Sequence, residues 1–384
     1  MIPFVDLTAQ FARIEQDVRR RMDAVLAHGK FIMGPEVAEL ERELAAFAGV
    51  EHCVSCASGT DALLLPLMAL GVGPGDAVFT SPFTFIATAE VISLLGATPV
   101  FVDIDASFNI DPARLDLAIQ AVKANDPSRH PLPRAKGQLT PKVVIPVDMF
   151  GLPADYVRCN AIAAAHGLHL LSDAAQSLGS EYTGRKAAAA ARITATSFFP
   201  AKPLGCYGDG GAVFTSDADM AALCQSLRLH GKGGHKYDNV RIGINGRLDT
   251  LQAAVLLAKL PIFPDELAKR RAVARAYTGR MASIPGIRTP ETPENSASAW
   301  AQYTLRHPRR DAIMDGLKAR GVPSVIYYPR PLHLQTAFAP LGYAEGAFPT
   351  AEAASREVFS LPMHPYLSAA DVDVICDAVA DAAS

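Results

Sequence analysis

The sequence predicts an α/β fold in which a doubly wound, mostly parallel sheet is followed by a smaller α+β region. Short apolar runs alternate with helical patterns through the first two thirds of the chain, which is typical of parallel strands joined by crossover helices. The chain has 384 residues, 49% of them hydrophobic and 20% charged, a composition typical of a soluble globular protein with more than one core. Because Pro261 and Pro264 follow the alternating region, we expect a large domain at 1–260 and a small domain at 261–384.

The charge balance argues against a nucleic-acid or membrane partner. The formal net charge is −3 at pH 7, so the chain has no excess of basic residues to attract phosphates. An acidic residue occurs as early as Asp6, unlike in a secretory leader, and the longest apolar runs, such as 62–72, are too short to span a membrane. A cytoplasmic location is therefore expected.

The cysteines are expected to be packing residues. Cys53 and Cys56 have the spacing of a metal or redox pair, but no second pair or nearby histidine completes such a site. The two residues also lie in an apolar run typical of a buried strand. No metal site is predicted.

The individual elements are predicted from apolar spacing and from the glycine and proline residues between them. Val37, Leu40, Leu44 and Phe47, for example, recur at intervals of three and four, which predicts a helix. Residues 124–142 lack periodicity and are rich in proline and charge, so we expect an exposed inserted loop. The expected helices are 17–27, 35–47, 62–70, 89–95, two that end near 122 and 165, 217–229, 250–260, 310–320 and 371–382. The expected strands are 52–56, 77–82, 98–103, 143–147, 168–171, 211–215, 302–306 and 324–328.

Candidate ligand-binding residues follow the first two of these strands. In a parallel sheet, ligands bind beyond the carboxyl ends of the strands. Ser58, Gly59 and Thr60 follow the first strand and begin a helix, so their amides could hold an anion, although serine and threonine are also common helix caps. Phe85 follows the second strand and could either stack on an aromatic cofactor or pack in the core.

A second candidate group follows the strand at 168–171. Asp173 could reach a ligand over the sheet edge or cap its own turn. With a pyridine cofactor, this carboxylate would pair with the ring nitrogen and keep it protonated. Gln176 could then approach the phenolic oxygen of the same ring.

Lys202 lies between a hydroxyl and aromatic run at 196–200 and a glycine-rich turn at 204–211. If the side chain is buried, desolvation lowers its pKa and provides the neutral amine that Schiff-base chemistry with a carbonyl requires. The alternative is a surface turn in which the lysine points to solvent. Together with an aspartate at a strand end, an aromatic platform and an anion cradle, the lysine matches the needs of pyridoxal phosphate.

The order of these residues resembles the fold type I aminotransferases and, more narrowly, the DegT/StrS family of nucleotide-sugar aminotransferases. The resemblance covers nearly the whole chain. It implies a large domain with a mostly parallel seven-stranded sheet sandwiched by helices, a smaller C-terminal α+β domain, and pyridoxal 5′-phosphate as cofactor. The motifs that carry it are Gly-Pro-Glu-Val at 34–37, Ala-Ser-Gly-Thr-Asp-Ala at 57–62, Asp-Ala-Ala-Gln at 173–176, Ser-Phe-Phe-Pro-Ala-Lys at 197–202, Gly-Asp-Gly-Gly at 208–211 and Asn-Gly-Arg-Leu-Asp at 245–249.

This resemblance implies a role for each motif residue. Lys202 would carry the cofactor and move a proton, Asp173 would pair with the ring nitrogen, Gln176 would bond the ring oxygen, and Phe85 would stack on the ring. The residues implied to hold the phosphate are Ser58, Gly59, Thr60, Ser197 and, from the neighbouring subunit of a homodimer, Asn245. The residues expected to bind substrate are Arg228, Tyr327, Tyr328, Arg330 and His333.

The implied substrates are L-glutamate and a keto nucleotide sugar for cell-surface polysaccharide synthesis, such as that of lipopolysaccharide O-antigen. We expect UDP-2-acetamido-2-deoxy-3-oxo-glucuronate, with a 4-keto-6-deoxy nucleotide sugar as the alternative. Tyr327 stands where a histidine is expected for the first substrate, Ser172 stands where many relatives have glutamate, and the loop at 124–142 is longer than the family's usual connection. A sugar dehydratase, in which histidine replaces the lysine, and a non-catalytic regulator are further alternatives that Lys202 and Asp173 disfavour.

Overall fold

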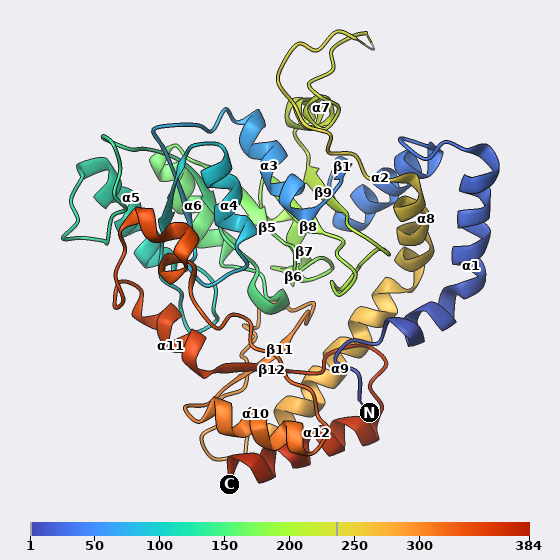
Figure 1. Cartoon of the computed structure of the whole chain (residues 1–384), viewed down its shortest axis with the longest axis vertical. Helices are drawn as coiled ribbons and strands as arrows, with labels where there is room; N and C mark the ends of the chain where they lie inside the picture. Colours follow the sequence, from blue (N-terminus) through green and yellow to red (C-terminus); the bar gives the residue numbers. More distant parts are fainter. Residues whose placement is uncertain (1, 236) are drawn as a thin grey trace.

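A seven-stranded, mostly parallel sheet forms the centre of the computed structural model, which describes residues 2–235 and 237–384 (Figure 1). Its strands are β1 (His52–Cys56), β2 (Asp76–Thr80), β3 (Thr98–Phe101), β4 (Thr140–Ile145), β5 (His169–Asp173), β8 (Ile193–Ser197) and β9 (Gly211–Thr215). They lie in the order β1-β9-β8-β5-β4-β2-β3, and β9 alone among them runs antiparallel to its two neighbours. The predicted α/β sheet is therefore confirmed.

Helices cover both faces of the sheet. On one face, α3 (Gly59–Ala69), α4 (Ala87–Leu94) and α7 (Ala218–Leu227) pack on alternate strand residues such as Val54, Val78 and Val213. The opposite face is covered by α5 (Pro112–Ala124) and α6 (Tyr156–His166) at one end and by α2 (Pro35–Ala48) and α8 (Thr250–Lys259) at the other. Helix α1 (Leu7–His28) lies against α8 at the edge of the molecule (Figure 1).

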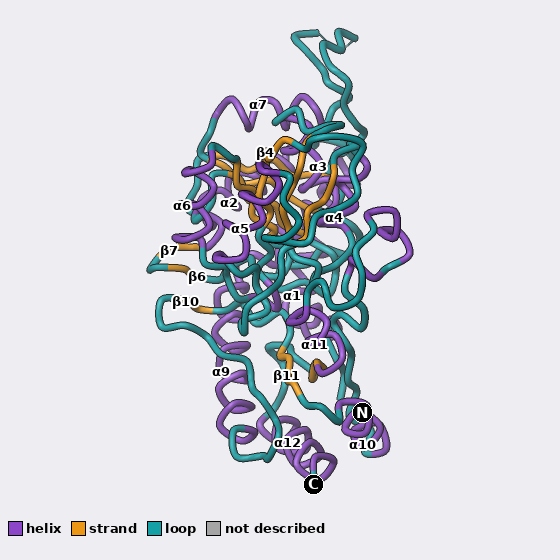
Figure 2. Tube along the Cα trace, turned by 90° about the vertical axis from the view of Figure 1, so that its left-hand side faces the viewer, coloured by secondary structure: helices purple, strands orange, loops and turns teal. Residues whose placement is uncertain are grey.

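A smaller part of the molecule surrounds the two-stranded sheet of β11 (Tyr303–Arg306) and β12 (Val358–Leu361). Its core includes residues of α10 (Arg310–Ala319), α12 (Ala369–Ala383) and the second half of α9 (Phe263–Met281). The first half of α9 packs in the core of the large sheet through Phe263 and Leu267. Since α9 crosses between the two cores (Figure 2), a domain boundary at 260/261 stays a prediction.

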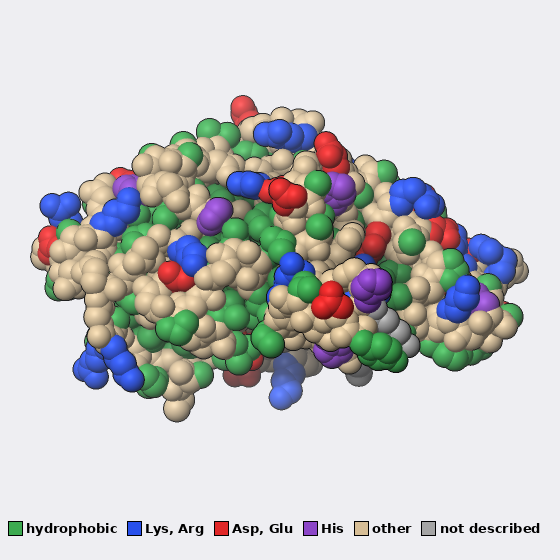
Figure 3. Space-filling view, turned by 90° about the horizontal axis from the view of Figure 1, so that it is seen from above, with side chains coloured by type: hydrophobic (Ala, Val, Ile, Leu, Met, Phe, Trp, Pro, Cys, Tyr) green, Lys and Arg blue, Asp and Glu red, His purple; other side chains and the backbone are tan. Residues whose placement is uncertain are grey.

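The remaining elements are short. Strands β6 (Glu181–Tyr182), β7 (Arg185–Lys186) and β10 (Ser296–Ala297) form a three-stranded sheet beside the main one, and α11 (Pro349–Glu357) precedes β12. Seen from above, the surface carries side chains of both charges interspersed (Figure 3). Within the described residues, no helix combines the length and the apolar character that a membrane span needs.

Two sequence-based expectations need correction. Residues 324–328 do not form a strand, because only Val325 pairs with a neighbour, Ser360, and Pro323 and Pro329 on either side have no amide hydrogen to donate. The 19-residue helix α9 was not expected, because Pro261 and Pro264 suggest an interruption of the chain. Pro264 instead occupies the first turn of α9, where a missing amide hydrogen costs no helical bond.

Candidate active site

The predicted site residues follow strands whose carboxyl ends meet at one edge of the sheet. Strands β5 and β8 are parallel neighbours, with Asp173 opposite Ala195. Strand β1 points the same way as β8, because each pairs antiparallel with the intervening β9. The turn after β1, the turn after β5 and the loop after β8 are therefore on the same side of the sheet, as the sequence predicts for the first two; strand β8 itself was not expected.

Asp173 is a buried carboxylate at the end of β5, with 5% of its surface exposed. Its Oδ2 accepts a hydrogen bond of 2.7 Å from the Thr88 hydroxyl, and its Oδ1 accepts one of 3.2 Å from the Ala175 amide. Burial raises the pKa of Asp173, while these two donors and the charge of Lys202 act in the opposite direction. Burial therefore disfavours the ionised form of Asp173, whereas the two hydrogen-bond donors and the charge of Lys202 favour it.

The contribution of Thr88 was missed by sequence reasoning. Thr88 lies in the first turn of α4, where it is buried, and its hydroxyl also lies 3.2 Å from that of Thr84. The two threonines flank the candidate Phe85 in the segment that leads into α4, and hydroxyl residues next to a candidate ligand contact are a signal that could have identified them.

Lys202 lies in a tight loop between β8 and β9. Its amide donates a 2.8 Å hydrogen bond to the Phe199 carbonyl. A Cβ at Gly205 would lie 2.5 Å from the Pro200 oxygen, so this turn needs glycine. The lysine side chain is half-buried, and burial lowers its pKa against the opposing effect of the Asp173 charge. The expected surface-turn alternative does not describe this environment, in which burial favours the neutral amine and the Asp173 charge favours the ammonium.

An anion cradle is formed where the start of α3 meets the end of β8. The Ser58 side chain caps α3 by accepting a 3.0 Å hydrogen bond from the Asp61 amide, so both predicted roles of this turn coexist. The amides of Gly59 and Thr60 belong to the first turn, where a helix has no internal partners for them. A Cβ at Gly59 would lie 2.6 Å from the Ser197 Cβ, so glycine permits the close approach of the two segments.

An aromatic and amide cluster is next to Asp173. Gln176 accepts a 2.8 Å hydrogen bond from the Phe150 amide and donates one of 3.2 Å to the Tyr328 hydroxyl. The ring centroid of Phe85 lies 6.4 Å from that of Tyr328, and 57% of Phe85 is exposed. Phe85 is therefore not a core residue, and its free surface is available to a ligand.

Two predicted substrate residues do not reach this cluster. Arg228 is buried, where its guanidinium forms an ion pair with Glu41 and donates a 2.6 Å hydrogen bond to the Ser55 carbonyl. His333 is 2% exposed and its Nε2 lies 3.0 Å from Glu352 Oε1. Both side chains are engaged inside the protein, which argues against their predicted role in substrate binding.

The other predicted residues are closer to the surface. Arg330 is exposed, and Tyr327 packs beside Phe4 with ring centroids 6.3 Å apart. Asn245 is exposed as well. The residue after it, Gly246, accepts a 3.1 Å hydrogen bond from the amide of Ala57 in the turn before α3. Their predicted contacts with substrate or with a second subunit stay predictions.

This arrangement fits a phosphorylated pyridine aldehyde such as pyridoxal phosphate. The half-buried Lys202 and the buried Asp173 influence each other electrostatically without forming a direct ion pair in the described structure. The close approach at Gly59 leaves the first amides of α3 and the Ser197 hydroxyl beside each other. An amine, a carboxylate and an anion cradle are the three contacts that such a cofactor needs.

Comparisons with known proteins identify the family. A model of the DegT/DnrJ/EryC1/StrS aminotransferase family matches residues 12–380. The chain is 46% identical over 380 residues to UDP-2-acetamido-2-deoxy-3-oxo-D-glucuronate aminotransferase of Pseudomonas aeruginosa, covering 99% of each chain.

Solved structures agree. A family aminotransferase from Brucella abortus has a TM-score of 0.93 at 50% identity, covering 99% of this chain and 98% of the other. The PLP form of a putative sugar aminotransferase from Streptococcus pneumoniae has a TM-score of 0.85 at 29% identity, covering 96% of each chain. The chain therefore belongs to the DegT/DnrJ/EryC1/StrS aminotransferase family, and it is an enzyme with the fold of pyridoxal-phosphate-dependent aminotransferases.

Proposed function

We propose that this enzyme uses pyridoxal 5′-phosphate to transfer the amino group of L-glutamate to a keto nucleotide sugar. The observation that carries the proposal is the placement of Lys202 and Asp173 at the carboxyl edge of the sheet, where burial shifts the pKa of each toward the neutral form and each charge opposes the shift of the other. Family membership and the structures of relatives support the same activity.

The residues that would hold the cofactor come from separate parts of the chain. Lys202 would bind its aldehyde, Asp173 would hold a proton at the ring nitrogen, and Phe85 would cover one face of the ring. The amides at the start of α3 and the hydroxyl of Ser197 would bind the phosphate. When bound, the cofactor supplies a carbonyl that accepts an amino group and a ring that withdraws electrons.

The chain's own residues would then position the substrates and move protons. Burial lowers the pKa of Lys202, which favours the neutral amine, and in this form it would take a proton from the donor carbon and return one to the sugar carbon. Thr88 holds the Asp173 carboxylate through its 2.7 Å hydrogen bond. The Phe150 amide holds Gln176 in the same way, which directs the Gln176 amide nitrogen toward Tyr328.

For the acceptor we propose UDP-2-acetamido-2-deoxy-3-oxo-glucuronate. The Pseudomonas aeruginosa relative named for that substrate matches the chain over nearly its full length. A 4-keto-6-deoxy nucleotide sugar remains the second candidate, because Tyr327 occupies the position where a histidine is expected. The pathway that fits the first acceptor is cell-surface polysaccharide synthesis, such as that of O-antigen, in the cytoplasm.

We further propose a homodimer in which Asn245 of one subunit completes the phosphate site of the other. An exposed apolar segment supports an assembly of this kind: Phe31, Ile32 and Met33 are 46%, 45% and 38% exposed. The loop after α7 also extends outward (Figure 1), and Ile242, three residues before Asn245, is 89% exposed. Light scattering at several protein concentrations would test the dimer. Asn245→Asp should weaken cofactor binding but leave the dimer intact.

The activity can be tested in two steps. The purified holoenzyme should absorb near the visible range, lose this band on addition of L-glutamate and regain it with the keto sugar. Lys202→Ala should lack the band, whereas Lys269→Ala, which removes a half-exposed lysine of α9, should retain it. A colourless wild type that binds no cofactor would contradict the proposal.

The acceptor is tested by a panel of 3-keto and 4-keto nucleotide sugars added to glutamate-treated enzyme. Faster return of the band with the 3-oxo-glucuronate would support our choice over the 4-keto sugars. A dehydrated sugar without amino transfer would favour a dehydratase, and no reaction with glutamate would favour a non-catalytic regulator.

A further inference from the structure

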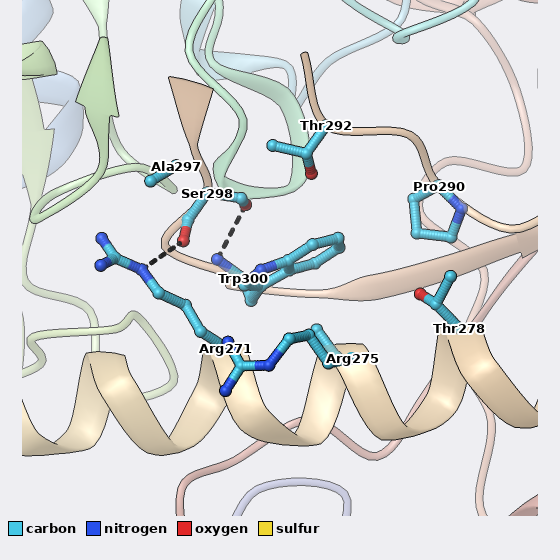
Figure 4. Close-up of a pocket in the computed structure, with 9 residues that line it drawn as sticks. Arg271, Arg275, Thr278, Pro290, Thr292, Ala297, Ser298 and Trp300 are labelled. Carbon is cyan, nitrogen blue, oxygen red and sulfur yellow. Dashed lines mark hydrogen bonds between the residues drawn. The ribbon is translucent and has the colours of Figure 1, made fainter. Parts of the chain in front are cut away.

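A cavity outside the candidate active site lies between α9 and the segment that leads into β11 (Figure 4). Its volume is about 360 Å³, within the range of small-molecule sites. The residues that give it its chemical character are Arg271, Arg275, Thr278, Pro290, Thr292 and Trp300. None of these residues has a role in the proposed transfer of the amino group.

The cavity carries positive charge. Arg271 and Arg275 lie one turn apart on α9, and among the described residues none that lines the cavity is acidic. Arg275 is exposed and has no ion pair within residues 2–235 and 237–384. Arg271 lies 3.5 Å from Glu181, but that carboxylate is shared with Lys186 at 3.0 Å. The positive charge of the cavity is therefore only partly balanced.

The donors of Arg271 are only weakly engaged. Its buried Nη2 lies 3.5 Å from Glu181 Oε1, the carboxylate oxygen that also accepts the closer bond from Lys186, and its Nε lies 3.5 Å from the Ser298 carbonyl. Both contacts are long for charge-assisted hydrogen bonds. An anion in the cavity would supply a closer acceptor, and arginine is well suited to binding phosphate.

Trp300, the single tryptophan of the chain, adds an aromatic surface. In Figure 4 its indole lies between Arg275 and Thr292 and extends toward Pro290. Hydrogen bonds fix its backbone, because its amide lies 3.0 Å from the Ser298 hydroxyl and its carbonyl accepts a 3.1 Å bond from Arg270. A fixed indole beside two arginines can receive a planar ring and an anionic group of the same ligand.

The cavity is connected to the candidate active site through the backbone. Gly151 lies so close to the Trp300 amide that a Cβ on it would be 2.8 Å away, and its carbonyl accepts a 2.9 Å bond from Ala299. The preceding residue, Phe150, donates the hydrogen bond that orients Gln176. A ligand on Trp300 is thus separated from Gln176 by a short series of direct contacts.

We propose that this cavity binds a nucleotide, with the base against Trp300 and the phosphate at Arg271 and Arg275. Two sources share this chemistry. The ligand is either the nucleotide part of the sugar substrate, a case that rests on the proposed function, or a free nucleotide that acts on the site through Gly151 and Gln176.

Tryptophan fluorescence tests the proposal, because the only indole of the holoenzyme lies in the cavity. UMP should change the emission saturably, with excitation at the long-wavelength edge of indole absorption, where uracil does not absorb. Uridine or inorganic phosphate alone should bind at least about tenfold more weakly, because each makes only part of the contacts. Equal affinity for phosphate and UMP would overturn the assignment to a nucleotide, and so would the absence of a saturable change.

A pair of arginine variants localises the binding. Arg275→Ala should weaken UMP binding about tenfold, the loss expected for a charge-assisted hydrogen bond. Arg280→Ala is the matched control, since it is on the same helix but is paired with Asp373 and Asp377. Equal affinity of the two variants would contradict the proposal, and this readout does not depend on amino transfer.

Kinetics then separate the two sources. If the cavity holds the substrate's nucleotide, Arg275→Ala should raise the KM for the nucleotide sugar with little change in kcat, and UMP should compete with the sugar. If the cavity holds a free nucleotide, Arg275→Ala should leave the KM for the nucleotide sugar unchanged. UMP should then affect the wild type non-competitively with respect to the sugar, and it should have no such effect on Arg275→Ala.

Discussion

Two lysines lie at the loop between β8 and β9, Lys202 half-buried and Lys259 fully buried, and their amines have different surroundings. Lys202 projects from the loop, and within the described residues its amine forms no hydrogen bond. Lys259 reaches the same loop from α8, is fully buried, donates a 2.6 Å hydrogen bond to the Gly205 carbonyl, and lies 4.3 Å from the ring centroid of Tyr207.

The difference shows that burial of a lysine does not by itself indicate catalysis. Burial lowers the pKa of both, that of Lys259 to about 8. The amine of Lys259 is occupied by a backbone acceptor, and the nearby Glu266 partly opposes the shift. The amine of Lys202 remains free for a covalent partner. The hydrogen-bond acceptor therefore distinguishes the lysine that supports the loop from the one that we propose to react.

The largest expected effect is on activity and comes from Lys202→Ala. Without this amine neither the covalent hold on the cofactor nor the proton transfer remains, so kcat/KM should fall by about 10⁴-fold or more. Thermal unfolding should be little affected, because the side chain forms no hydrogen bond in the described structure. Amino transfer and the melting temperature would be measured together. Activity within tenfold of the wild type would remove Lys202 from the mechanism.

The second effect comes from the carboxylate that faces this lysine. Asp173→Asn keeps the shape and can still accept the hydrogen bond from Thr88, but it cannot hold a proton at the ring nitrogen. We expect kcat/KM to fall about 10²- to 10³-fold, the usual cost of removing one electrostatic contact at a reacting centre. Transient kinetics with glutamate would measure it. A variant as active as the wild type would show that the ring needs no partner here.

The comparison also explains what the sequence could predict. Asp173 and the turn at Ser58 were predictable, because each comes at the end of an expected apolar strand and parallel strands bring such positions together. Ser197 was identified only through its motif, because strand β8 was not expected. Their placement depends on where the strands end and on the parallel arrangement of the sheet. Both are indicated by the apolar runs and the helical segments between them in the sequence.

The surroundings of other side chains depend on distant partners. Arg228 is held by Glu41, which is 187 residues away, and His333 is held by Glu352 of another helix. Nothing beside either residue in the sequence marks it as internal. For the same reason Lys259 resembles any lysine in the last turn of an amphipathic helix.

A smaller effect on activity is expected from Lys259→Met. The loop loses one backbone hydrogen bond but keeps Lys202, so activity should fall no more than about tenfold. A loss comparable with that of Lys202→Ala would end the distinction between the two lysines.

The stability of Lys259→Met should differ from that of the wild type in its pH dependence. The pKa of Lys259 is about 8 in the folded protein and 10.5 in its unperturbed state, so the unfolded chain binds more protons between these values. The free energy of unfolding of the wild type should therefore rise across this window, by at most about 3 kcal/mol. Urea unfolding at pH 8 and pH 10 should show this rise in the wild type and its absence in the variant.

The smallest effect on activity is expected from substitution of Asp148. This buried carboxylate lies next to the proposed site, but it has no proposed contact with the cofactor and is paired with neither lysine. It accepts hydrogen bonds of 2.6 Å from Tyr156 and 2.5 Å from Ser177, and its own amide donates a 3.0 Å bond to the Asp173 carbonyl. Burial raises the pKa of Asp148 from 3.8 to about 7. Asn can accept the bond from Tyr156 and donate to the Ser177 oxygen, so Asp148→Asn should stay within about threefold of wild-type activity.

The effect of this substitution should appear instead in the acid range. A carboxyl whose pKa is raised by folding contributes stability below its unfolded pKa, and this contribution is lost as the pH rises through the folded value. For Asp148 the loss occurs between pH 3.8 and about 7 and amounts to about 4 kcal/mol at most. Urea unfolding at pH 5 and pH 7.5 should show a decrease in the wild type that is smaller in Asp148→Asn. If both proteins have the same slope, Asp148 is ionised throughout, and a buried charge beside Asp173 would have to be included in the electrostatics of the reacting centre.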